Sequence, residues 1–236
     1  MKRILSLAVI SMLLTASSSA QYSDSSSKKL SLRTRLSTTN FQLRSLFIPT
    51  SLMLAGIGTS SNGRESFKME LVEKRNELLP VFHTKIDNYL KFSPIVIAYG
   101  LDAAGLKSRT DFVNRTVILI KGELLAMGSV GLLKAATHQL RPDGSTYNSF
   151  PSGHTAQAFA AATFLSEEYK QRLPWIPYAA YGIAGSVGAL RMANNRHYIS
   201  DVLFGAGLGF LSMKAAYWTH RYQWNKRGTN SRLVHL

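Results

Sequence analysis

The stretch that decides the fold reads KAATHQLRPDGSTYNSFPSGHTAQAFAAATFL and covers residues 134–165 of the 236-residue chain. It joins the end of one apolar segment to the start of the next through a polar connection that contains Pro142, Gly144 and Pro151. The apolar segments on both sides are long and rich in alanine, which favours helix over strand. The stretch therefore predicts two helices joined by a polar loop.

Working outward from it, five apolar segments of this kind follow one another: Pro94–Leu106, Val117–Ala136, Thr155–Leu165, Ile176–Leu190 and Val202–Trp218. Together they predict an all-α fold, a bundle of helices. Gly182, Gly185 and Gly188 recur at every third position, and we expect them to form one helix face on which a neighbouring backbone approaches closely.

The chain starts with the features of an export signal. Lys2 and Arg3 precede the apolar run 4–14, and small residues follow before residue 21. We expect residues 1–20 to be a signal peptide or an uncleaved N-terminal anchor. Residues 21–44 are rich in serine, threonine and basic residues, so they predict a basic, poorly ordered lead-in.

Residues 45–92 combine an apolar patch with an amphipathic region. The patch, residues 46–57, is broken by Pro49 and is shorter than the roughly 20 residues that a membrane span needs. Residues 64–90 alternate charged and apolar side chains and predict an amphipathic helix interrupted at Pro80. That helix either caps the core or lies on a membrane surface. Residues 93–219 then form the expected helical core, and residues 220–236 a basic tail.

The charge balance predicts an anionic partner. Lysine and arginine number 28 against 13 acidic residues, a formal net charge of +15, and there is no cysteine for disulfides or thiolate metal sites. An exported chain does not meet cytoplasmic nucleic acid, so we expect phosphorylated lipids, phosphate esters or an acidic membrane surface instead.

Basic residues also suggest an orientation, if the helices cross a membrane. They fall in connections on one side of a zigzag through the five segments: Lys107, Arg109, Arg115, Lys170, Arg172, Arg221, Lys226, Arg227 and Arg232. The positive-inside rule makes that side cytoplasmic. The other side receives the loops at 141–154 and 191–201 and would face outward, towards the periplasm. A soluble helical domain is the alternative.

Three groups of residues carry possible chemistry. Lys134 and Arg141 lie seven positions apart, which returns them to nearly the same helix face before Pro142 ends the helix. Ser152 and Gly153 precede an apolar run, where a helix N-terminus offers free backbone N–H groups to an anion and Ser152 adds a hydroxyl donor. Alone, two cations near a helix end are more typical of a solvated terminus, and the second group is equally typical of a helix cap.

The third group pairs His197 with Asp201, four positions later, so that the carboxylate can reach the imidazole on a helical turn. A carboxylate that accepts one ring N–H fixes the tautomer and makes the other nitrogen more nucleophilic. Arg191 adds a third permanent cation. Asp143 and Asp201 are the acidic residues near these groups, too few for a carboxylate-bridged metal pair.

Together the groups resemble the signature of the type 2 phosphatidic acid phosphatase (PAP2) superfamily, which includes vanadium haloperoxidases and bacterial class A acid phosphatases. That signature reads K-x6-R-P, then P-S-G-H, then S-R-x5-H-x3-D. The chain matches it at Lys134, Arg141, Pro142, Pro151, Ser152, Gly153, His154, Arg191, His197 and Asp201. Leu190 replaces the usual serine, which removes one hydrogen bond to phosphate.

The resemblance implies a PAP2-type helical bundle with the phosphate site at the helix ends, and hydrolysis without metal or other cofactor. His197 would attack phosphorus and form a phosphohistidine, Asp201 would orient it, and His154 would protonate the leaving oxygen. Lys134, Arg141 and Arg191, with donors from Ser152 and Gly153, would hold the phosphate oxygens.

Among family members the chain looks most like bacterial envelope enzymes that act on lipid A, phosphatidylglycerophosphate or polyprenyl pyrophosphate, so we expect a membrane-associated lipid phosphatase. A soluble periplasmic acid phosphatase of broad specificity is the first alternative. A haloperoxidase and a non-catalytic basic lipid-binding module are the others.

Overall fold

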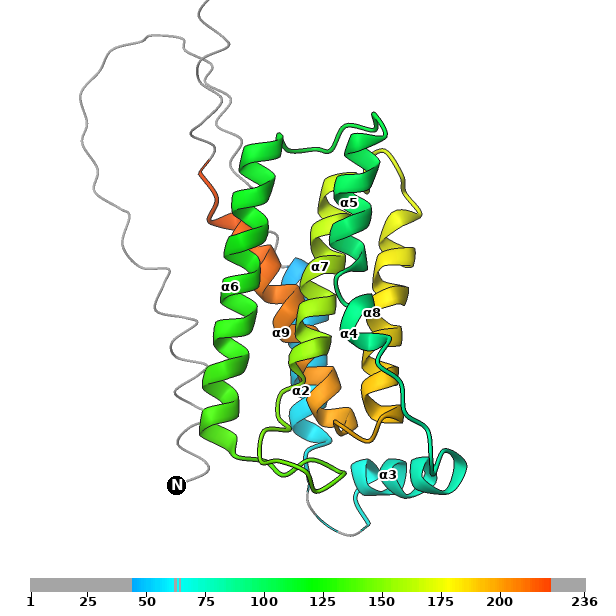
Figure 1. The fold of residues 1–236 in the computed structure, drawn as a ribbon. Coiled ribbons are helices and arrows are strands. Elements are labelled where there is room, and N and C mark those ends of the chain that lie inside the picture. The colour runs from blue at the N-terminus through cyan, green and yellow to red at the C-terminus, as the bar shows by residue number, and fades with distance from the viewer. Residues whose placement is uncertain (1–43, 62, 64, 222–236) are drawn as a thin grey trace, which may run out of the picture. The chain divides into compact units, whose positions relative to one another are not determined.

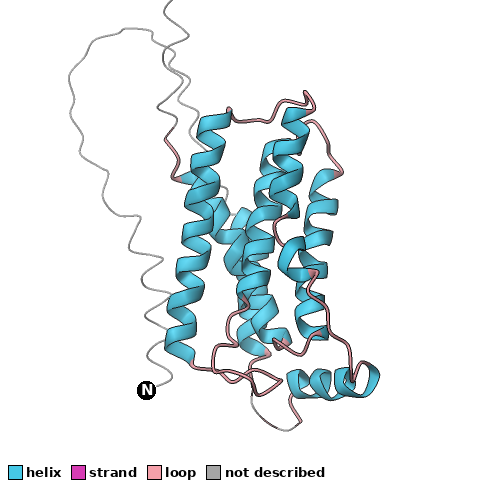
Figure 2. Ribbon diagram, in the orientation of Figure 1, coloured by secondary structure: helices cyan, strands magenta, loops and turns pink. Residues whose placement is uncertain are grey.

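A computed structural model describes residues 44–61, 63 and 65–221, and all regular structure in this part of the chain is helical (Figures 1 and 2). Eight helices are described: α2 (Arg44–Gly58), α3 (Phe67–Leu78), α4 (Asp87–Leu90), α5 (Ser93–Ala103), α6 (Phe112–Thr137), α7 (Gly153–Tyr169), α8 (Ile176–Ala193) and α9 (Ile199–Trp218). The expected all-α class is confirmed for the described residues. The predicted signal segment 1–20, the basic lead-in up to residue 43 and the tail beyond Arg221 lie outside them.

Helices α7 and α9 form the centre of the bundle. Helix α7 packs against α5, α6, α8 and α9, and α9 packs in addition against α2 and α6 (Figure 1). Nearly every side chain of α7 after His154 is buried, and many of them are alanines. Small side chains on a buried helix let neighbouring helices come close from several directions.

Glycines on α9 make these close contacts possible. A Cβ on Gly209 would lie 1.9 Å from the carbonyl oxygen of Ala156, and one on Gly205 would lie 2.6 Å from that of Ser152. On another side of α9, a Cβ on Gly207 would meet the carbonyl oxygen of Pro49 in α2. Only a residue without a side chain fits at such distances, so α9 holds α7 and α2 in backbone contact.

The glycine face predicted on α8 is wrong. Cβ atoms on Gly182 and Gly185 would meet nothing within 4 Å, and only Gly188 faces a neighbour, Val202 of α9. Residues three apart in a helix step around its axis, so the three glycines do not share one contact line. The close approach that we expected there occurs on α9 instead.

The N-terminal helices cover the bundle. The apolar patch 46–57 forms α2, which includes Pro49 and lies along α9. Helix α3 ends at Leu78, so the expected interruption at Pro80 is confirmed. Helix α3 contacts α8 and α9, as expected for a helix that caps the core.

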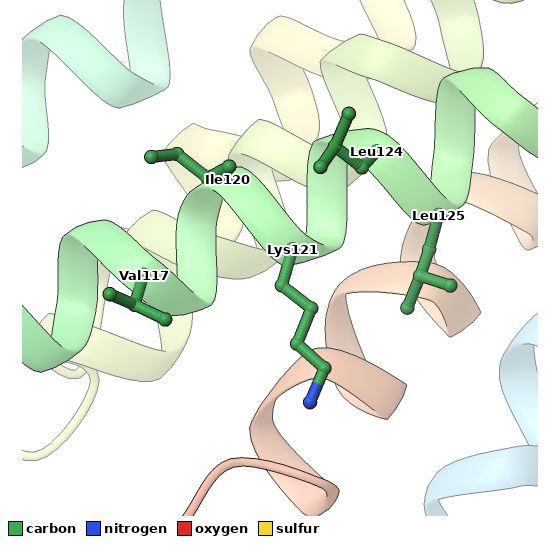
Figure 3. A pocket seen from close by; sticks show the side chains of 5 residues that line it. All are labelled: Val117, Ile120, Lys121, Leu124 and Leu125. Carbon is green, nitrogen blue, oxygen red and sulfur yellow. The ribbon is translucent and has the colours of Figure 1, made fainter.

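Two of the described helices, α6 and α9, have the length and apolar composition to cross a membrane. They differ in their surroundings, because the apolar part of α9 is mostly buried in the bundle whereas that of α6 is mostly exposed. A shallow hollow of about 480 Å³ lies against α6 and is lined by Val117, Ile120, Lys121, Leu124 and Leu125 (Figure 3). An apolar, outward-facing helix of 26 residues is what a bilayer would accommodate.

The connections meet at two ends of the bundle, as the zigzag predicts. At one end the backbone N–H of Arg109 donates to the carbonyl oxygen of Glu168, which joins the α5–α6 connection to the end of α7. Three basic residues there share one partner: Glu167 contacts Arg109, Lys170 and Lys214. Arg115, which we expected in a connection, lies inside α6, buried and 2.6 Å from Asp102.

Candidate active site

The first part of the site is the connection from α6 to α7. Helix α6 ends at Thr137, and His138 follows in the left-handed conformation at φ 43°. Arg141 therefore lies beyond the helix, and the shared helix face that we predicted for it and Lys134 is wrong. A turn, in which the Arg141 N–H donates to the carbonyl oxygen of Thr146 at 3.0 Å, folds the connection back instead. Lys134 donates from Nζ to the carbonyl oxygen of Asn148 in the same connection.

Ser152 starts α7. Its hydroxyl caps the helix by accepting from the backbone N–H of Thr155, and its own N–H donates to the carbonyl oxygen of Asp201 at 3.0 Å. The side chain is fully buried, so its hydroxyl serves the cap. The N–H groups of Gly153 and His154 are the first two of the helix and have no helical carbonyl to bond.

The turn between α8 and α9 supplies the other half of the site. Helix α8 ends at Ala193, and Asn195 takes a left-handed conformation at φ 59°. The backbone N–H of Arg196 then returns to the carbonyl oxygen of Arg191 at 3.0 Å. This reversal places His197 just before α9, close to the end of α8.

His197 and Asp201 lie together in this turn. Nδ1 of His197 is 3.4 Å from Oδ2 of Asp201, but this buried nitrogen makes no hydrogen bond. Asp201 is fully buried and accepts from the backbone N–H of Tyr198 and the hydroxyls of Ser149 and Ser200. The carboxylate is thus fixed independently of the imidazole, and Nε2 is the nitrogen of His197 that does not face it.

The cations predicted from the sequence interact electrostatically with one another and with Asp201. Burial lowers the pKa of Arg141, and the charges of Arg191 and Arg196 lower it further, which shows that the guanidinium groups lie within electrostatic range of one another. Nε of Arg141 and Nε of Arg191 are buried without a hydrogen-bond partner. Buried donors of this kind are costly unless an acceptor reaches them.

His154 faces the same group of charges. Burial lowers its pKa to about 3, and Arg191 and Lys91 add to the effect while Asp87 opposes it. Burial likewise lowers the pKa of His197, against the opposing effect of Asp201. Both imidazoles are therefore neutral at pH 7, as a nucleophile requires of His197. Arg191 acts electrostatically on both imidazoles, and His197 has a smaller effect on His154.

The low pKa of His154 in the folded protein predicts that acid lowers the stability of the fold. Unfolded histidines bind protons below their ordinary pKa of 6.5, whereas folded His154 does so only near 3. Because the unfolded state then binds more protons, the midpoint temperature of unfolding should fall as the pH drops from 7 to 5, measured in a buffer without phosphate. His154→Gln should make this fall shallower. Equal slopes for the two proteins would contradict the burial of a neutral His154.

Several residues at the site carry no signal in the sequence motifs. The carboxylate of Asp87 in α4 lies 2.6 Å from Nη1 of Arg191, and both side chains are buried. Asn88 accepts at 2.8 Å through Oδ1 from Nε2 of His154. Asp87 must therefore be added to the acidic residues expected near the site. Arg196, between two motif positions, pairs with Asp143 at 2.9 Å.

Helix α3 lies beside the turn between α8 and α9 that carries His197. A small hollow of about 20 Å³, room for about one water molecule, lies between them. Lys68 of α3 is buried there, with Nζ 4.7 Å from the centre of the Tyr198 ring. Burial lowers the pKa of Lys68, and the charge of Asp201 opposes that shift. A further cation thus lies within electrostatic range of the carboxylate of Asp201, from a part of the chain without a recognisable motif.

Comparison with known proteins finds a family match over part of the chain. Residues 115–225 match the PAP2 superfamily, and all of the residues that carry the signature fall inside this range. The chain thus carries a PAP2 superfamily domain, and the resemblance drawn from the three motifs is confirmed. Asp87 and Asn88 lie outside the matched range.

A curated relative is the lipid A 1-phosphatase of Porphyromonas gingivalis, 42% identical over 138 residues. The match covers 58% of this chain, and the chain spans about a third of that protein, 31% of its length.

Two solved structures are similar in fold. Aquifex aeolicus LpxE is 22% identical with a TM-score of 0.47, over 62% of this chain and 93% of that one. The PAP2 type phosphatidylglycerolphosphate phosphatase of Bacillus subtilis is 20% identical with a TM-score of 0.45, over 72% and 94%.

Proposed function

We propose that this chain is a phosphatase that removes phosphate from a phosphorylated lipid of the bacterial envelope. The observation that carries the proposal is the meeting of three separate chain segments at one end of the bundle. There the charge of Arg191 acts on both neutral histidines, the charge of Lys134 acts on His197, and Arg141 interacts electrostatically with Arg191 and Asp201. The unpartnered Nε–H groups of Arg141 and Arg191 are suited to donate hydrogen bonds to phosphate oxygens.

The chemistry follows from this arrangement. Nε2 of His197 attacks phosphorus in line, and the bond from phosphorus to the leaving oxygen breaks. His154 gives its proton to that oxygen, and the product alcohol leaves. In the second step His154 takes a proton from water, the resulting hydroxide attacks the phosphohistidine, and inorganic phosphate and neutral His197 are released. Asp201 stabilises the positive charge that His197 carries between the two steps.

His154 must be protonated to act first as an acid, although its pKa is low without substrate. A phosphate ester brings two negative charges next to Arg191 and Lys91, the cations that disfavour the protonated imidazole. Binding of the substrate therefore raises the pKa of His154 in the complex. The cations hold the equatorial oxygens, and catalysis consists mainly of positioning and charge stabilisation.

A lipid substrate is supported by the relative named a lipid A 1-phosphatase and by the apolar, exposed face of α6. We infer that the protein is associated with the membrane, with the candidate site facing away from the cytoplasm. The basic connections at the opposite end of the bundle support that orientation. Leu190, where the family usually has serine, removes one phosphate contact and is expected to weaken binding.

The proposal is tested by phosphate release from lipid A, phosphatidylglycerophosphate, polyprenyl pyrophosphate and a soluble chromogenic ester, each with and without EDTA. We expect release from at least one lipid, faster than from the soluble ester and unchanged by EDTA. Preference for the soluble ester, with release of the protein by osmotic shock alone, would indicate an acid phosphatase instead. A loss in EDTA that a divalent ion restores would contradict the metal-free mechanism. No release from any substrate would leave a binding module.

A further inference from the structure

Helix α4 lies against two residues of the phosphate site. Its residues Asp87 and Asn88 are consecutive, yet their side chains contact different helices: Asp87 reaches Arg191 of α8, and Asn88 reaches His154 of α7. These two contacts link the ends of α7 and α8 through a segment that the family match does not cover. We propose that Asn88 is a positioning residue for His154, held in place by the attachment of α4 to α8. The catalytic part of this inference rests on the proposed function, whereas the contact between Asn88 and His154 does not.

The attachment of α4 to α8 is extensive for so short a helix. Asp87 is fully buried and accepts from Nη1 of Arg191 at 2.6 Å and from Nδ2 of Asn194 at 3.3 Å. The side chain of Asn194 in turn bonds the backbone of Thr84 in both directions, each at 2.9 Å. Four hydrogen bonds therefore fix residues 84–87 on the end of α8, and Asn88 follows directly.

The contact with Asn88 selects one state of His154. The amide oxygen of Asn88 only accepts, so the proton of neutral His154 is on Nε2, and Nδ1 is the nitrogen that exchanges a proton with the substrate. The same oxygen still accepts from Nε2 when the ring is protonated. Asn88 therefore keeps the ring in one orientation through both steps of the reaction, in which His154 gives up a proton and then takes one.

The other charged groups that act on His154 do not replace this contact. They are Arg191 on α8, Lys91 just after α4, Asp87 on α4, and His197 in the α8–α9 turn. Arg191, Lys91 and His197 disfavour the protonated ring, and Asp87 favours it while bonded to Arg191. Asn88 is neutral, and its side chain contacts the ring of His154 directly. A charge introduced at position 88 therefore acts directly on proton transfer by His154.

Asn88→Asp tests the contact, because it keeps the shape of the side chain and adds a negative charge at Nε2. The probe is the titration of His154 by nitrogen NMR of the full chain labelled at histidine, assigned by the signal lost in His154→Gln. We expect the pKa of His154 to rise by about 1 unit or more. Tyr89→Asp is the matched control, since it adds the same charge on α4 at a side chain that is 78% exposed. Equal shifts in the two variants, or none, would overturn the proposal.

Kinetics on the best lipid substrate give the second readout. In Asn88→Asp the alkaline limb of the pH profile of kcat, where His154 loses its proton, should move to higher pH by about 1 pH unit. Asn88→Ala should lower kcat about tenfold, because the ring of His154 is no longer held in one orientation. KM should change less than about twofold, because no contact to the phosphate is removed. A change in KM alone would overturn the positioning role. A wild-type chain inactive on every substrate would instead refute the proposed function, and the NMR result would still decide whether Asn88 holds His154.

Discussion

Replacement of His197 by alanine is expected to reduce phosphate release from the lipid substrate by at least about a thousandfold. The change removes Nε2 of His197, which is the attacking atom in the proposed mechanism. The fold should survive the change. Asp201 keeps the partners Ser149, Ser200 and the backbone of Tyr198, so it is not left as an unpaired buried charge.

The measurement is single-turnover release of labelled phosphate, with quenching in base, in which phosphohistidine is stable. Wild type should show label on the protein that disappears as phosphate is released, and His197→Ala should show none. The matched control is His83→Ala, which removes an exposed histidine in the α3–α4 connection and should behave as wild type. Residual turnover above about one hundredth of wild type in His197→Ala would remove His197 as the nucleophile.

Gly209→Ala is expected to have the largest effect on stability. Its new Cβ would lie 1.9 Å from the carbonyl oxygen of Ala156, so α9 must move away from α7. Overpacking of a rigid interface costs about 3 kcal/mol, and here the obstacle is backbone rather than a flexible side chain. The displacement also acts on the site, because the hydrogen bond from Ser152 to Asp201 joins the same two helices one and two turns away.

Thermal unfolding of the purified chain and phosphate release, measured side by side, would check this. The matched control is Gly185→Ala on α8, where a Cβ meets nothing within 4 Å. It should raise the stability by up to about 1 kcal/mol, since alanine favours helix. Similar midpoints for the two variants would show that α7 and α9 are not in backbone contact.

Much of the fold could be predicted because apolar composition and proline mark the helices. All five predicted apolar segments form helices, and Pro80 lies in the break after α3. The starts were less accurate: the predicted segment 117–136 begins five residues earlier, at Phe112, where Asp111 caps the helix. An aspartate that caps a helix is a local signal, and a prediction made from apolar composition alone does not include it.

Which glycines contact a neighbour could not be predicted from spacing. That depends on where two helices cross, a property of the tertiary structure rather than of one segment. Two of the three regularly spaced glycines on α8 contact no neighbouring helix, whereas the less regular glycines of α9 touch α7 and α2. Likewise Lys134 and Arg141 come together through a turn, and helix periodicity gave the wrong reason for their proximity.

The residues proposed for catalysis were accessible to sequence reasoning because their spacing forms three recognisable motifs. Asp87, Asn88 and Lys68 were not, since they belong to segments that precede the motifs and meet them only after folding. A buried aspartate that pairs with a motif arginine has no pattern along the chain. Contacts between distant segments of this kind are the part of the site that only coordinates reveal.

The contact between α2 and α9 limits how this protein can be shortened. Residues 115–225 carry the whole family signature, yet Gly207 of α9 rests on the backbone of Pro49, and Arg191 finds its counter-charge on α4. A fragment that contains only the matched residues would expose the backbone of α9 at Gly207 and would leave the buried guanidinium group of Arg191 without its carboxylate. The smallest autonomous unit is therefore larger than the homologous one, and its N-terminal limit lies at or before α2.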